Sequence, residues 1–176
     1  MAAVVLLRGV NVGGHRVFRP TTLVRQLEHL GAVNIGAAGT FVIRRSMAQT
    51  ELRAHIARLL PFDAEIVIRP ASDFLRLSPP RAFITGAQRP DVVRFLSVMT
   101  RAPRALPSLP LQLPVSGAWL VRLEARQGRL VFGQYRRHLK TIGYLGELDR
   151  LLGVPVTTRN WNTVGAIIKA LAPETG

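Results

Sequence analysis

Hydrophobic and polar positions follow two different periods in the N-terminal part of the chain. Residues 2–8 form a continuous apolar run, typical of a strand that is buried on both faces. Residues 20–31 and 50–60 instead place leucine and isoleucine at helical spacing. Three further β-rich runs predict short strands at residues 32–36, 40–45 and 64–70. The predicted order is β-α-β-β-α-β, the ferredoxin-like arrangement.

After Pro79-Pro80 the pattern changes, which predicts a boundary between a subdomain at 1–78 and a second one at 79–176. In the second subdomain we expect strands at 81–86 and 92–99, a hairpin at 118–137, and helices at 144–153 and 162–171. Four prolines within residues 103–114 predict a surface loop. The whole chain is therefore expected to be an α+β protein whose ferredoxin-like half is joined to a smaller α+β subdomain.

Composition excludes several classes of protein. No apolar run reaches the roughly 18 residues that a membrane span needs, and Arg8 comes too early for a signal peptide, so a cytoplasmic protein without a membrane partner is expected. The chain has no cysteine, which excludes disulfides, thiolate nucleophiles and Cys-ligated zinc. Its four histidines are far apart in sequence, so no metal site is predicted.

The charge balance of 24 basic and 10 acidic residues gives +14, which ordinarily suggests a polyanionic partner. Only Lys140 and Lys169 are lysines, and the arginines are scattered over every segment. This distribution favours a generally basic surface with one focused anion site. Nucleic-acid binding is the alternative.

The loop at residues 8–16 is the first candidate for anion binding. It follows a buried strand, and glycines such as Gly13 and Gly14 let successive backbone N–H groups point into one concavity. It lacks the residues of a P-loop and the glycine spacing of a dinucleotide fingerprint. A tight connection without a ligand is the alternative interpretation.

A second candidate lies at residues 133–141. If the strand continues through this segment, Arg136, His138 and Lys140 share one face and attract a phosphate or carboxylate. A solvated strand end is the alternative.

The third candidate is the segment Val154 to Ala170. Val164, Ile167 and Trp161 fall at helical spacing and are expected in a core, with a helix that starts between Thr157 and Asn160. Thr158 or Asn160 would cap that helix. Capping accounts for only one or two of the polar residues in this segment. The others are expected either to bind an anion at the positive end of the helix or to contact the other half of the protein.

Three blocks of this sequence resemble the domain of unknown function (DUF) 1697 family: "LLRGVNVGGHR", "NIGAAGTFVIR" and "LGVPVTTRNWNTV". The resemblance implies a two-part α+β fold in bacterial cytoplasmic proteins. At three places this sequence departs from the residues usual in the family, and these changes remove hydroxyl and amide groups from the implied site or change its charge. His15 stands where lysine is frequent, Ala38, Gly39 and Thr40 replace a Ser-Gly-Asn turn, and the segment around Lys140 replaces Ser-Lys-Leu.

The leading hypothesis is a site for an anionic, phosphorylated or nucleotide-like small molecule that joins these blocks. Its predicted residues are Arg8, Asn11, Gly13, Gly14, Lys140, Arg159, Asn160 and Asn162. Standard catalytic motifs are missing, so enzymatic activity, cofactor and oligomeric state are left open. The alternatives are a nucleic-acid-binding module with a basic surface, and a structural or partner-binding protein whose polar blocks hold the two halves together.

Overall fold

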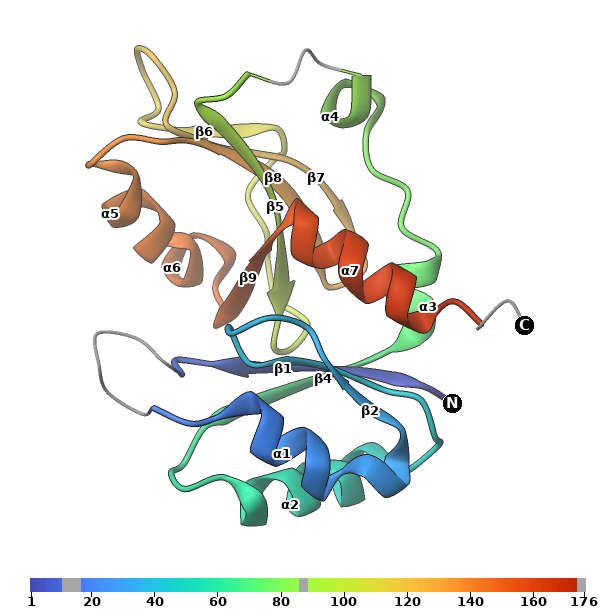
Figure 1. The fold of residues 1–176 in the computed structure, drawn as a ribbon. Coiled ribbons are helices and arrows are strands. Elements are labelled where there is room, and N and C mark those ends of the chain that lie inside the picture. Colours follow the sequence, from blue (N-terminus) through green and yellow to red (C-terminus); the bar gives the residue numbers. More distant parts are fainter. Residues whose placement is uncertain (11–16, 86–88, 174–176) are drawn as a thin grey trace. The chain divides into compact units, whose positions relative to one another are not determined.

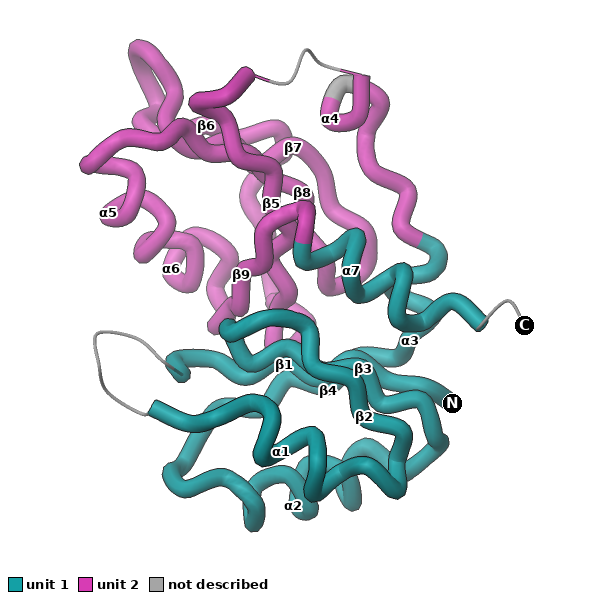
Figure 2. Tube along the Cα trace, viewed as in Figure 1, with its two compact units in different colours: residues 1–76, 163–176 teal, residues 77–162 magenta. Residues whose placement is uncertain are grey.

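The computed structural model of the protein describes residues 1–10, 17–85 and 89–173 (Figure 1). The chain divides into two compact units: residues 1–76 with 163–176, called unit 1, and residues 77–162, called unit 2 (Figure 2). Helices and strands are mixed in two antiparallel sheets, which confirms the predicted α+β class. No helix within the described part of the chain is both long enough and apolar enough to cross a membrane.

Unit 1 contains the elements predicted for the N-terminal half, in the predicted order. The six predicted elements are β1 (Ala3–Arg8), α1 (Pro20–Gln26), β2 (Ala32–Asn34), β3 (Thr40–Ile43), α2 (Gln49–Leu59) and β4 (Glu65–Pro70). A 3-10 turn η1 (Glu28–Leu30) and a short helix α3 (Ala71–Leu75) are added to them. The strands form one sheet in the order β2-β3-β1-β4, and every neighbouring pair is antiparallel.

The sheet of unit 1 is apolar on both faces. Val5, Leu7 and Phe41 lie in the main core, together with residues of α1 and α2 such as Leu27 and Ile56. On the opposite face, Val4, Leu6 and Val42 are each 0% exposed. The continuous apolar run at residues 2–8 therefore reflects burial on both sides, as its pattern predicts.

Gly39 closes the turn between β2 and β3 in a conformation that requires glycine. Its φ is +70°, and a Cβ there would lie 2.8 Å from Val10 Cγ2 and 2.9 Å from Leu7 Cβ. Its carbonyl accepts a hydrogen bond from Leu7 N at 2.7 Å. The turn is thus pressed against the end of β1, where a side chain has no room.

Unit 2 is built on a five-stranded antiparallel sheet in the order β6-β7-β8-β5-β9. Its elements are α4 (Arg81–Thr85), β5 (Val92–Met99), β6 (Leu111–Leu113), β7 (Val121–Gln127), β8 (Leu130–Arg136), α5 (Thr141–Gly146), α6 (Leu148–Leu152) and β9 (Val156–Asn160). One face packs against α5 and α6 in a core that includes Phe95, Met99, Val131 and Leu152. At its centre, Gly133 on β8 lies under the ring of Phe95.

The helix α7 (Trp161–Leu171) begins in unit 2 and continues into unit 1. From Thr163 onward its residues belong to unit 1, and Ala170 O accepts a hydrogen bond from Arg44 Nε at 3.3 Å. The sequence placed all of residues 79–176 in the second subdomain. The structure differs here, because the chain enters the second unit after Arg76 and leaves it again at Thr163.

Two predicted element types are wrong. Residues 81–85 form the helix α4 rather than a strand, and Phe83 in it is 1% exposed against the rings of Phe132 and Trp161. The preceding proline pair favours a helix start, and Phe83 N bonds to Pro80 O at 2.8 Å. The segment 156–160, expected to start a helix, is the strand β9, and the helix begins only at Trp161.

The other differences are smaller. Strand β8 ends at Arg136, and residues 137–140 turn into α5, so Arg136, His138 and Lys140 do not lie on one strand face. The segment 103–114 is largely irregular, as predicted, but three of its residues form β6 and pair with β7.

Candidate functional site

A polar pocket of about 230 Å³ lies within unit 2, at one edge of its sheet. Its lining consists of Val92, Val93, Arg94, Arg137, Asn160, Trp161 and Asn162. Two of the predicted residues, Asn160 and Asn162, are therefore brought together on one pocket wall. None of the described residues that line it carries a carboxylate.

The pocket exists because β9 is shorter than the strand beside it. Strand β9 pairs with β5 only as far as the Asn160–Phe95 pair, after which the chain turns away into α7. Residues 92–94 of β5 lie beyond that last pair and form the opposite wall. Asn160 and Asn162 stand at the turn from strand to helix, on either side of Trp161.

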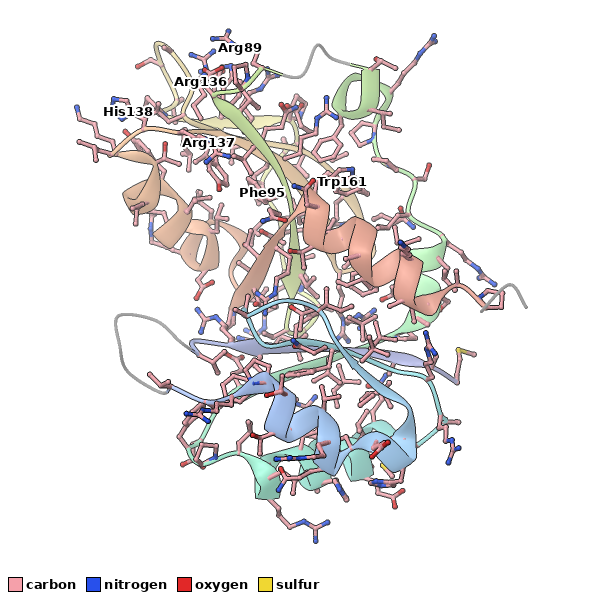
Figure 3. All side chains as sticks on the ribbon, viewed as in Figure 1. Arg89, Phe95, Arg136, Arg137, His138 and Trp161 are labelled. Carbon is pink, nitrogen blue, oxygen red and sulfur yellow. The ribbon has the colours of Figure 1, made fainter. Side chains whose placement is uncertain are left out.

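Two arginines, Arg94 and Arg137, are the charged residues among those that line the pocket. Arg94 projects from β5, with its Cζ 5.7 Å from the centre of the Phe83 ring. Arg137 follows β8, and its backbone N–H donates to Asp91 O at 2.8 Å, which holds the chain end against β5. Figure 3 shows Arg136, Arg137 and His138 in succession at the end of β8.

The carboxylate of Asp91 is engaged by another arginine. Arg89 Nε lies 2.9 Å from Asp91 Oδ1, and the hydrogen bond from Arg89 holds the pKa of Asp91 below its usual range. Asp91 therefore stays ionised and paired with Arg89, which is not among the pocket residues. Arg94 and Arg137 are the charged residues of the described lining.

Trp161, which lines the pocket, packs against two further aromatic rings. Trp161, labelled in Figure 3 at the start of α7, packs edge-on against Phe83 with ring centroids 5.0 Å apart, and lies 6.2 Å from the Phe132 ring. The sequence assigned Trp161 to a core. The structure gives it both roles, because it packs on these rings and also lines the pocket.

Arg159 does not have the position predicted for it. It is 8% exposed, and its Nη1 donates to Thr157 Oγ1 at 2.8 Å and to Thr158 O at 2.9 Å. Burial lowers the pKa of its guanidinium to about 10. Thr158, expected as a helix cap, instead shares a 2.7 Å hydrogen bond with Ser97 Oγ on β5. Arg159 is thus part of the interior around β9 and does not line the pocket.

The remaining predicted residues lie elsewhere. Lys140 is exposed in the turn before α5, where its backbone N–H donates to His138 Nδ1 at 3.1 Å. Arg8, in unit 1, lies at the end of β1 and pairs with Glu65 Oε2 at 3.1 Å. Asn11, Gly13 and Gly14 fall outside the described residues, so a site shared between their loop and unit 2 stays a prediction.

Sequence reasoning missed Arg94 as a site residue and did not select Arg137. A signal for Arg94 was present, because an arginine interrupts the apolar strand at residues 92–99. Such a charge inside a strand marks either an edge or a polar face. Arg137 was part of the predicted basic segment, but the turn after Arg136 that carries it to the pocket could not be read from the sequence.

A larger cavity in unit 1 has a different chemistry. It measures about 370 Å³ and is bounded mainly by apolar residues in and next to α1 and α2, including Phe18, Leu23 and Leu60, with Arg19 as its one charged group in the described lining. Among the described residues, no group of three His, Cys, Asp or Glu side chains is placed to hold a metal ion. The unit 2 pocket is therefore the better candidate for an anion.

The sequence over residues 1–106 matches the family model described as protein of unknown function (DUF1697). The chain belongs to this family. A search of curated proteins finds no match. Among solved structures, the fold is similar to that of the conserved bacterial protein SP0830 from Streptococcus pneumoniae, with a TM-score of 0.63, 18% sequence identity and 97% of each chain covered. At this identity the likeness concerns the fold alone.

Proposed function

We propose that this member of the DUF1697 family binds the phosphate group of a phosphorylated ligand in the unit 2 pocket. The observation that carries the proposal is that two arginines, Arg94 and Arg137, and two asparagines, Asn160 and Asn162, line one small cavity. Arginine presents a planar set of N–H donors that matches the oxygens of phosphate and carboxylate, and carboxamides add neutral donors.

Size and charge favour phosphate as the bound group. At about 230 Å³ the pocket is smaller than the usual range of small-molecule sites, so it holds a charged head group and leaves the rest of a ligand outside. A phosphate group presents its oxygens tetrahedrally and can accept hydrogen bonds from donors on different sides of a pocket, whereas a carboxylate presents its two oxygens in one plane. The proposed ligand is therefore a phosphate ester rather than a simple carboxylate.

Isothermal titration calorimetry with inorganic phosphate and with a nucleoside monophosphate tests this proposal. Arg94→Ala and Arg137→Ala should each weaken phosphate binding about tenfold or more, because charge-assisted hydrogen bonds contribute roughly 1.5–3 kcal/mol. Arg126→Ala is the matched control, since Arg126 is an exposed arginine of unit 2 that does not line the pocket. Equal losses in all three variants would show that affinity follows net charge alone, and the pocket would not be the site.

A further inference from the structure

The face of the unit 2 sheet next to the pocket carries a row of polar side chains across three strands. Arg94 on β5 pairs in register with Gln134 on β8, and Gln134 pairs with Arg122 on β7. Residues paired in register point to the same face of an antiparallel sheet. Arg94, one of the two arginines that line the pocket, is thus the first member of a row that continues away from the pocket.

A second arginine and a tryptophan extend this row. Arg136 lies two residues beyond Gln134 on β8 and therefore on the same face. Its Cζ is 4.4 Å from the centre of the Trp119 ring, and Arg122 Cζ is 5.4 Å from the same ring. Among the described residues, Arg136 Nε is buried without a hydrogen-bond acceptor. We call Arg94, Gln134, Arg122, Arg136 and Trp119 the basic-aromatic row.

The row remains accessible. All its members are half-buried, and the Arg122 side chain is 37% exposed. The carboxylate of Glu124 is 13% exposed and lies next to two of these polar groups: Oε1 is 3.3 Å from Arg122 Nε and accepts from Gln134 Nε2 at 3.3 Å. A second carboxylate, Asp91, has its pKa lowered by the hydrogen bond from Arg89 and in smaller part by the charge of Arg136, but it is paired with Arg89. Glu124 orients these two side chains and neutralises one of three positive charges, so the row is still cationic.

We propose that the pocket's phosphorylated ligand is a segment of single-stranded nucleic acid that runs from the pocket along the basic-aromatic row. This inference rests on the proposed function. Two strand spacings, about 10 Å, separate Arg94 from Arg122, which calls for a ligand with more than one phosphate. Both tryptophans of the chain flank the path, Trp161 at the pocket and Trp119 at the far end.

The chemistry of the row matches this ligand class better than other polyanions. Single-strand binding surfaces combine a positively charged track with aromatic rings on which unpaired bases stack. Bases also stack on the guanidinium plane of arginine, and the Trp119 ring already lies near two such groups. A sulfated polysaccharide has no planar group for Trp119, and the bases of a duplex are already stacked on one another.

Fluorescence anisotropy with a labelled twelve-nucleotide single strand and a duplex of the same sequence tests the inference in the full chain. We expect the single strand to bind more tightly than the duplex, with an affinity that falls as salt rises. Trp119→Ala should weaken single-strand binding about tenfold, as expected for one stacked base. Trp119→Phe should restore most of it, and inorganic phosphate should bind both variants as it binds the wild type.

Arg122→Ala provides a second variant that does not depend on the tryptophan. It should reduce the slope of log affinity against log salt by about 1, whereas Arg126→Ala on the same strand, outside the row, should leave it nearly unchanged. The inference is overturned if duplex or dextran sulfate binds as tightly as the single strand, or if Trp119→Ala and Arg122→Ala have no effect. Phosphate binding without oligonucleotide binding overturns this inference alone, whereas loss of both overturns the proposed function as well.

Discussion

The two sheets of this protein use their second face differently. In unit 1, both faces are closed: Leu6 and Val42 on one side are as fully buried as Val5 and Phe41 on the other. In unit 2, one face is a core against α5 and α6, while the other face is divided. Leu96 and Phe132 are buried on it, and arginine and glutamine occupy only its end, across β5, β8 and β7. A sheet that is apolar on both faces uses its side chains for packing alone, whereas the polar end of the second sheet presents half-buried side chains that a ligand can reach.

The strongest test of this difference is the removal of a side chain from the second face of the unit 1 sheet. Leu6→Ala should lower the free energy of unfolding by about 3–4 kcal/mol, because Leu6 is 0% exposed and its loss leaves a cavity. Urea denaturation measures this change. Gln134→Leu, on the polar face of unit 2, is the counterpart and should change stability by less than about 1 kcal/mol. Similar losses in both variants would remove the contrast between the sheets.

The core face of unit 2 is tested at the contact between Gly133 and Phe95. A Cβ at Gly133 would lie 2.2 Å from Phe95 Cζ and 2.9 Å from Arg122 O. Gly133→Ala should therefore destabilise the protein by about 2–3 kcal/mol through overpacking. The second substitution Phe95→Leu should recover part of this loss by making room. No recovery in the double variant would mean that the backbone contact, and not the ring, causes the strain.

Arg159 and Arg94 belong to the same unit, but we expect the first to contribute to stability and the second to phosphate binding. Arg159→Ala should lower the free energy of unfolding by about 2 kcal/mol, since it removes a buried donor from Thr157 Oγ1 and Thr158 O. Its affinity for phosphate should equal that of the wild type. Arg94→Ala should show the reverse, with a small change in melting temperature and weak phosphate binding. Calorimetric titration and thermal melts on both variants decide this, and weakened phosphate binding by Arg159→Ala would restore Arg159 to the site.

The smallest expected effect is a gain in stability within α7. A Cβ on Gly165 meets no atom within 4 Å, and the residue lies inside a helix. Gly165→Ala should thus raise stability by roughly 0.5–1 kcal/mol through helix propensity. Gly39→Ala is the opposite case, because a Cβ there clashes with Val10 and Leu7 at a positive φ. A loss of stability in Gly165→Ala would indicate that α7 packs more tightly than the structure shows.

Strong local patterns predicted much of this fold. Three of these patterns are the apolar run at residues 2–8, the helical spacing within residues 50–60 and the hairpin predicted at residues 118–137. They correspond to β1, α2 and the β7–β8 hairpin. In each, the period of the hydrophobic positions agrees with the burial that the element meets in the fold. The prediction failed at residues 81–86 because five of them form a helix that is held by one buried ring, Phe83, and a local pattern cannot show which rings it meets.

The candidate site was only partly predictable. Asn160 and Asn162 stood out because the segment holds more polar groups than a helix start needs. Arg159 stood out for the same reason but is buried beside Thr157, since alternation along a strand sends neighbouring residues to opposite faces. Because residues 156–160 form a strand rather than the start of a helix, Arg159 is buried in the interior and Asn160 lines the pocket.

The sequence by itself determined the α+β class, the element order of the first half and the unusual polar content of the segment before α7. Those features depend on local periodicity and composition, which the chain carries without reference to its distant parts. Only the tertiary structure decided that β9 pairs with β5, which joins residues 61 positions apart such as Ser97 and Thr158. That pairing ends at Asn160, and this places Arg94 and Arg137 beside the two asparagines. The pocket depends on where one strand stops along another, and no local pattern contains that information.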